Sequence, residues 1–142
     1  MTEVLSVGYQ GRSQSDILHI IQEYGLEQVL DVRENARSIK PGFSSAELQR
    51  AFHRIGVKYV HLPQLGCTQE SRHALWSGTR PEAFLNKYRH LLSQRPEAVI
   101  DLLDRVRSGK TLLLCLERDP ARCHRAVLEE LLRTKGIPVR SL

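Results

Sequence analysis

The sequence predicts a three-layer, Rossmann-like α/β fold, with a mostly parallel five-stranded sheet and helices on both faces. Short apolar runs alternate along the chain with segments whose apolar residues recur at helical spacing. Gly, Pro or Asp bounds most of these runs, as is typical of buried strands. The chain has 142 residues and no internal repeat, so we expect one domain over residues 1–142.

The first half of the chain predicts strands over residues 4–7, 29–33 and 57–62, separated by two helices. Each helix opens with a capping box, in which a serine and an acidic residue three positions later satisfy free backbone N–H groups. These boxes are Ser13 with Asp16 and Ser44 with Glu47. Glycines at positions 25 and 56 end the two helices.

Periodicity is lost between residues 63 and 80, which predicts a long loop with a turn of helix near 72–76. Prolines at positions 81 and 96 open helices to about residues 94 and 107. The apolar run 111–116 predicts a fourth strand, and Asp119 with Pro120 opens a helix to about Lys135. Residues 137–142 form a last strand, which Pro138 places at the sheet edge.

Polar residues follow each of the first four strands, at the edge where open parallel sheets bind ligands. The expected set is Tyr9, Gly11 and Arg12 from the first strand, Asp31, Arg33 and Arg37 from the second, His61 from the third, and Cys115, Glu117, His124 and Arg125 from the fourth. Guanidinium groups match phosphate and carboxylate geometry, and glycine permits close backbone approach. We therefore expect Tyr9, Gly11, Arg12, Arg33, Arg37, His61 and Arg125 to bind an anion. The alternative is surface arginines paired with nearby acids.

Four residues are candidates for catalysis. Cys115 ends a strand beside positive charge, which favours a thiolate nucleophile, whereas a small buried apolar side chain is the alternative. Asp31, Glu117 and His124 are candidate acids or bases, or else orient the arginines by hydrogen bonding.

No cofactor and no metal site is expected. Cys123 and His124 are neighbours in the predicted helix and would point about 100° apart, which makes a shared metal ion awkward. Cys115, Cys123 and His61 would supply three ligands, but no C-x2-C spacing supports such a site.

The bulk composition limits the partners. A net charge of +5 and a pI near 9.4 fit an anionic ligand or nucleic acid, or simply solubility. No run approaches the ~20 apolar residues of a membrane span, and the first residues lack a signal peptide pattern, so we expect a cytoplasmic protein with no membrane partner. Three cysteines in such a compartment are expected to be free thiols. The sequence does not set the oligomeric state.

Four blocks of the sequence resemble the signature blocks of the "domain of unknown function 488" family. They are S-V-G-Y-Q-G-R-S, V-L-D-V-R with R-S-I-K-P-G-F-S behind it, Y-V-H-L-P-Q-L-G, and L-L-L-C-L-E-R-D-P-A-R-C-H-R, in order from Ser6 to Arg125. The resemblance implies a compact Rossmann-like domain and, as the family name states, no assigned activity. The signature positions it implies are Tyr9, Gly11, Arg12, Asp31, Arg33, Ser38, Phe43, His61, Leu65, Gly66, Cys115, Glu117, Cys123, His124 and Arg125.

Three hypotheses for function follow. The favoured one is a small enzyme that acts on a phosphate-bearing or nucleotide-like anionic substrate at the carboxyl edge of the sheet. The second is a nucleic-acid-binding or DNA/RNA-processing accessory module, based on the positive charge. The third is a thiol redox or metal-responsive protein that uses Cys67, Cys115 and Cys123.

Overall fold

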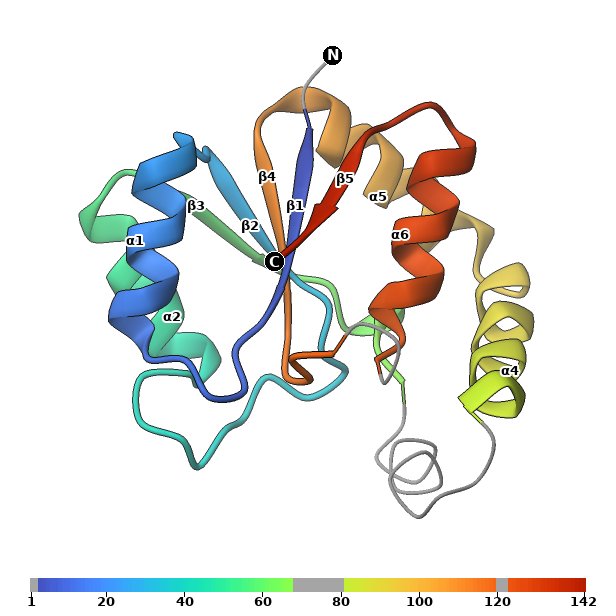
Figure 1. The fold of residues 1–142 in the computed structure, drawn as a ribbon, viewed down its shortest axis with the longest axis horizontal. Coiled ribbons are helices and arrows are strands. Elements are labelled where there is room, and N and C mark those ends of the chain that lie inside the picture. Colours follow the sequence, from blue (N-terminus) through green and yellow to red (C-terminus); the bar gives the residue numbers. More distant parts are fainter. Residues whose placement is uncertain (1–2, 68–80, 120–122) are drawn as a thin grey trace.

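The protein forms one five-stranded sheet flanked by helices in a computed structural model that describes residues 3–67, 81–119 and 123–142 (Figure 1). The elements are β1 (Val4–Gly8), α1 (Gln14–Tyr24), β2 (Gln28–Asp31), α2 (Ser45–Arg54), β3 (Lys58–His61), the 3₁₀ helix η1 (Pro63–Leu65), α4 (Pro81–Ser93), α5 (Pro96–Ser108), β4 (Thr111–Cys115), α6 (Arg125–Thr134) and β5 (Val139–Ser141).

The strands lie in the order β3-β2-β4-β1-β5, and every neighbouring pair is parallel. The expected α/β class is therefore confirmed, and the described sheet is parallel throughout. Among the described strands, β5 pairs only with β1, so its predicted place at an edge is also confirmed. β4 has four apolar residues among its five and lies in the centre of the sheet, covered on both faces.

Helices cover both faces of the sheet, with α1 and α2 on one side and α4, α5 and α6 on the other (Figure 1). Strand side chains alternate between the two cores because successive residues point to opposite faces. In β4, Leu112 and Leu114 pack with Ile17 of α1, whereas Leu113 and Cys115 belong to the core beneath the second helical layer. Cys115 is thus part of a core, completely buried.

Local chemistry explains where α1 and α2 begin. Both predicted capping boxes are present: the hydroxyls of Ser13 and Ser44 accept from the N–H groups of Asp16 and Glu47, whose carboxylates accept from the serine N–H groups. Gly25 ends α1 in the left-handed conformation, as expected.

The start of α6 was predicted wrongly. The helix begins at Arg125, with His124 at its N-cap, and not at Pro120 after an Asp119 cap. Cys123 and His124 therefore lie in a bend and a turn before the helix. Pro120 itself and the turn of helix expected near 72–76 lie outside the described residues. Among the helices that are described, none is long and apolar enough to cross a membrane.

Candidate functional site

The carboxyl ends of four strands are level in the sheet. Gly8 at the end of β1 pairs with Cys115 of β4, and Asp31 of β2 pairs with His61 of β3. The parallel pairing therefore brings the polar segments that follow β1 to β4 to one edge, as the sequence predicted. We take this carboxyl edge as the candidate functional site.

The segments after β1 and β4 lie in direct backbone contact. The N–H groups of Tyr9 and Gln10 donate to the carbonyls of Cys115 and Leu116, each at 2.9 Å. A Cβ atom on Gly8 would lie 1.7 Å from the Glu117 carbonyl oxygen, an impossible separation. Glycine at this position is what allows the two segments to meet.

Asp31 and Arg33 form a buried ion pair beneath the edge. Arg33 Nε and Nη2 donate to the two carboxylate oxygens of Asp31 at 2.8 and 2.6 Å, and the Arg33 backbone N–H and the Tyr59 hydroxyl donate to the same carboxylate. Arg33 Nη1 also donates to the Phe43 carbonyl at 2.8 Å and to Tyr9. Arg33 is 2% exposed and Asp31 is 0% exposed, so both side chains are occupied by partners inside the protein.

The electrostatics of this pair are consistent with a structural role. Burial alone would lower the pKa of Arg33, but the hydrogen bonds and charge of Asp31 outweigh it and raise that pKa further. Burial and the Asp31 charge together raise the pKa of Tyr59, which keeps its hydroxyl a donor.

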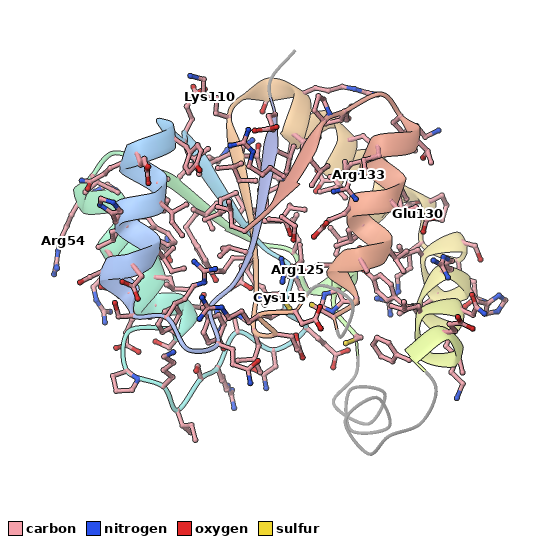
Figure 2. All side chains as sticks on the ribbon, in the orientation of Figure 1. Arg54, Lys110, Cys115, Arg125, Glu130 and Arg133 are labelled. Carbon is pink, nitrogen blue, oxygen red and sulfur yellow. The ribbon has the colours of Figure 1, made fainter. Side chains whose placement is uncertain are left out.

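Arg125 makes internal contacts through its two terminal nitrogens, while its Nε is buried without a hydrogen-bond partner in the described part of the chain. It is completely buried at the start of α6, where Nη1 donates to Ser6 Oγ at 2.6 Å and Nη2 donates to the Glu117 carbonyl at 2.7 Å. Glu129, one turn further along the helix, lies 3.8 Å from Nη1. Figure 2 shows Arg125 and Cys115 near each other at the lower end of the sheet. Arg125 therefore ties β1, the β4 loop and α6 together.

Three further cations surround the β1–α1 turn and are less enclosed. Lys40 Nζ donates to the Tyr9 carbonyl at 3.1 Å, and the backbone N–H of Arg118 donates to Gln10 Oε1 at 3.4 Å. A Cβ atom on Gly11 would lie 3.3 Å from Arg118 Nη1, so this guanidinium group lies against the turn. Arg12 completes the group, and its Nε is buried without a hydrogen-bond partner in the described part of the chain.

The cations around this turn repel one another. Burial and the neighbouring charge of Arg118 lower the pKa of Arg12, and Arg125 adds to this, with Asp16 opposing in part. The N-terminus of α1 is already occupied by its own capping box. The positive charge at the turn therefore comes from the cationic side chains and not from the N-terminus of α1.

On the other side of the edge, three thiols and an imidazole form a buried cluster, which we call the sulfur–histidine cluster (Cys67, Cys115, Cys123 and His124). His124 Nδ1 lies 3.4 Å from Cys67 Sγ and 3.8 Å from Cys123 Sγ, and His124 Nε2 lies 3.9 Å from Cys115 Sγ. His124 Nε2 donates to the Val32 carbonyl at 2.9 Å. All four side chains are 5% exposed or less.

The protonation states within the cluster depend on one another. Burial opposes a thiolate at Cys123, but hydrogen bonds from Cys115 and the charge of His124 prevail and lower its pKa. The same Cys123 raises the pKa of His124 against the effect of burial. A hydrogen bond to Cys123 and burial raise the pKa of Cys115, so Cys123 rather than Cys115 is the preferred thiolate. Burial, followed by the charge of Cys123, raises the pKa of Glu117 to about 7.

The other predicted site residues are spread along the edge. Tyr9 is buried and stacks on Phe43 with ring centroids 4.3 Å apart. His61 Nε2 donates to the Arg33 carbonyl at 2.7 Å. Gly11 adopts a left-handed φ of 74°, and Arg37 is exposed on the loop after β2.

Sequence reasoning did not place Arg118, Lys40 or Cys67 among the site residues, although the third hypothesis did use Cys67. Cys67 follows η1, far along the chain from the other cysteines, and no spacing rule connects it to His124. Only the folded arrangement brings these residues to the site.

A protein-family model described as "Domain of unknown function DUF488" matches residues 13–132. The chain belongs to this family. The match covers most of the chain and includes α1 through most of α6. Searches of the curated proteins and of the solved structures find no match. DUF488 membership thus agrees with the resemblance in the sequence and leaves the activity unassigned.

A separate groove of about 580 Å³ lies between α4, α5 and α6, away from the carboxyl edge. Most of its lining residues are apolar, such as Leu92, Val99 and Leu131, and none of the lining residues is a cysteine or histidine. Nothing in it resembles a catalytic arrangement, so the carboxyl edge remains the better candidate site in this DUF488 protein.

Proposed function

We propose that the protein is a small enzyme that binds a phosphate-bearing or nucleotide-like substrate at the carboxyl edge, with the anionic group held by Arg12 and Arg118. The observation that carries this proposal is the buried Arg12 Nε, which lacks a partner in the described chain and lies within a group of mutually repelling cations. A buried donor without a partner costs about 1–3 kcal/mol, and a bound anion removes that cost.

The contacts of the neighbouring cations also support an anion site at this turn. Arg118 lies against the Gly11 turn, and Lys40 is held to the Tyr9 carbonyl, so three positive side chains surround one short segment. An oxyanion among them would accept charge-assisted hydrogen bonds, and guanidinium groups suit the geometry of phosphate. In this proposal Arg33 and Arg125 support the turn, through the Tyr9 hydroxyl and the Glu117 carbonyl, rather than holding the anion as expected from the sequence.

The position of the turn supports a ligand site there. In open parallel sheets, ligands bind beyond the carboxyl ends of strands whose connections leave in opposite directions. Here β1 and β4 are neighbours, the chain from β1 leads to α1, and the chain from β4 leads to α6 on the other face (Figure 1). Glu117, on the same loop as Arg118, is a candidate acid or base for the reaction.

Binding is tested by calorimetric titration of the protein with pyrophosphate and with a nucleoside diphosphate. We expect one of these probes to bind, and Arg12→Gln and Arg118→Gln each to weaken it about tenfold or more, since charged hydrogen bonds contribute about 1.5–3 kcal/mol. Arg54→Gln is the matched control, because Arg54 is exposed at the end of α2, far from Arg125 (Figure 2). Its binding should equal that of the unmodified protein.

Two outcomes would overturn the proposal. The first is that neither probe binds, or that all three variants lose binding equally. The second is that a DNA or RNA oligonucleotide binds instead, with an affinity that falls steeply with salt, which would favour the nucleic-acid module. Turnover is followed by phosphorus NMR of a mixture of phosphate esters and nucleotides. Binding without any turnover would reduce the protein to a binder and remove the enzyme from the proposal.

A further inference from the structure

The sulfur–histidine cluster has the composition of a structural zinc site. Zinc in such sites is held tetrahedrally by four Cys or His ligands, and three cysteines with one histidine is a common set. The candidate ligand atoms of Cys115, Cys123 and His124 lie within 4.8 Å of one another. Cys67 Sγ lies outside this group but 3.4 Å from His124 Nδ1, and it is the candidate fourth ligand.

The distances are close to those that zinc requires. With Zn–S near 2.3 Å and Zn–N near 2.0–2.1 Å, a tetrahedron separates sulfur from nitrogen by about 3.6 Å and sulfur from sulfur by about 3.8 Å. The distances from His124 Nδ1 to Cys67 Sγ and Cys123 Sγ are 3.4 and 3.8 Å, on either side of the first value. Cys115 Sγ lies 3.9 Å from the other ring nitrogen, Nε2, and within 4.8 Å of Cys123 Sγ, so it must shift toward Nδ1 to complete the tetrahedron.

The imidazole is oriented as a zinc ligand. Its Nε2 donates to the Val32 carbonyl at 2.9 Å, so Nδ1, which lies 3.4 Å from Cys67 Sγ and 3.8 Å from Cys123 Sγ, is the nitrogen that can bind a metal ion once it loses its proton. Metal-binding histidines almost always donate their second ring nitrogen to a backbone carbonyl, a carboxylate or water, because this fixes the ring and its tautomer.

The surroundings suit a site with several thiolates. The first amide of α6, on Arg125, donates to Cys123 Sγ at 3.5 Å, so the positive end of a helix faces one of the sulfurs. Arg125 follows Cys123 by two positions, and its buried guanidinium group donates to the Glu117 carbonyl. Three thiolates and one Zn²⁺ leave one negative charge, which these positive groups favour and which the buried Glu117 carboxyl, with Oε2 3.6 Å from Cys115 Sγ, opposes.

Burial favours a metal over redox chemistry. Thiols that sense oxidants are exposed, whereas Cys67, Cys115 and Cys123 are 5%, 0% and 1% exposed. A disulfide would also use only two of the three sulfurs and would leave the directed imidazole without a role. A metal ion uses all four groups at once.

We propose that Cys67, Cys115, Cys123 and His124 form a structural zinc site that joins the segment after η1, the end of β4 and the start of α6. The site lies on the opposite side of the carboxyl edge from Arg12 and does not depend on anion binding there. The sequence did not predict this site, because Cys123 and His124 were expected within a helix that begins at Pro120. In the structure they lie in the turn before α6.

The test uses Co²⁺ as a spectroscopic probe for Zn²⁺ in the full chain, reduced and stripped of metal with a chelator. We expect one Co²⁺ per chain, with intense visible bands typical of tetrahedral thiolate coordination, and Zn²⁺ should displace it. Cys123→Ser and His124→Asn should each weaken binding at least about tenfold. His53→Asn is the matched control, because His53 is exposed on α2 and outside the cluster.

A second measurement covers variants that do not fold. Zn²⁺ should raise the unfolding midpoint of the unmodified protein, and the rise should be complete at one equivalent, because only the folded chain assembles the four ligands. The absence of cobalt thiolate bands, an unchanged midpoint with zinc, or equal binding by Cys123→Ser would each overturn the site. A Cys115–Cys123 disulfide formed by a mild thiol oxidant, in protein that takes up no metal, would overturn it in favour of a redox pair.

Discussion

Replacing Arg33 by methionine separates a structural role for this guanidinium group from a role in ligand binding. Arg33 donates four side-chain hydrogen bonds, two to Asp31 and one each to Tyr9 and the Phe43 carbonyl. In Arg33→Met, the completely buried carboxylate of Asp31 keeps only a backbone N–H and the Tyr59 hydroxyl as donors.

The expected loss is about 3–5 kcal/mol of unfolding free energy, the usual cost of leaving one partner of a buried ion pair uncompensated. That is a large part of the total stability of about 5–15 kcal/mol for a domain. Adding Asp31→Asn to Arg33→Met should recover part of the loss, because the second change removes the unpaired charge.

Urea denaturation followed by circular dichroism measures the loss, with Arg54→Met as an exposed control that should change stability by no more than about 0.5 kcal/mol. The reasoning would be refuted if Arg33→Met lost less than about 1 kcal/mol while phosphate binding disappeared. Arg33 would then serve to bind a ligand and would contribute little to the stability of the fold.

Two further predictions concern local structure. Gly8→Ala should lower the unfolding free energy by more than about 3 kcal/mol in the same assay, since its Cβ would lie 1.7 Å from the Glu117 carbonyl oxygen. Gly56→Ala is the control and should lower it by only about 1–2 kcal/mol, because Gly56 has a φ of 73° but open space around its Cβ position. Equal losses in the two variants would contradict the close approach at Gly8. The pKa values of Asp16 and Glu47 are lowered by the hydrogen bonds of their capping boxes, so their contribution to stability is present above the ordinary values of 3.8 and 4.5 and is lost as pH falls through the folded values. Asp16→Asn should therefore lower the thermal midpoint at neutral pH and have little effect near about pH 2, and an equal effect at both pH values would contradict this assignment.

Much of the fold could be predicted because local chemistry determines it. The capping boxes at Ser13 and Ser44, the prolines that open α4 and α5, and the short apolar strands are all signals that lie within a few residues of one another. The alternation of these elements then leaves few topologies, because parallel strands need crossover helices. The carboxyl edge could be located for the same reason.

The details of the site depend on contacts between distant segments, which the sequence does not reveal. Arg33 and Arg125 have the chemistry of anion binders, but whether their partners are a ligand or an internal carboxylate depends on burial. The start of α6 was placed too early because Asp119 and Pro120 form a standard helix-opening pair in sequence. That error placed Cys123 and His124 within a helix, where their side chains would point about 100° apart, and so obscured the cluster with Cys67.

The central position of β4 has a consequence for synthesis on the ribosome. β1 and β2 are not neighbours, since β4 lies between them and pairs with both. A nascent chain that has emerged only as far as α5 therefore holds β2 and β3 as a pair and leaves β1 without either of its partners. The sheet closes only after Thr111–Cys115 leaves the exit tunnel, so the exposed strand edges before that moment are natural clients for chaperones.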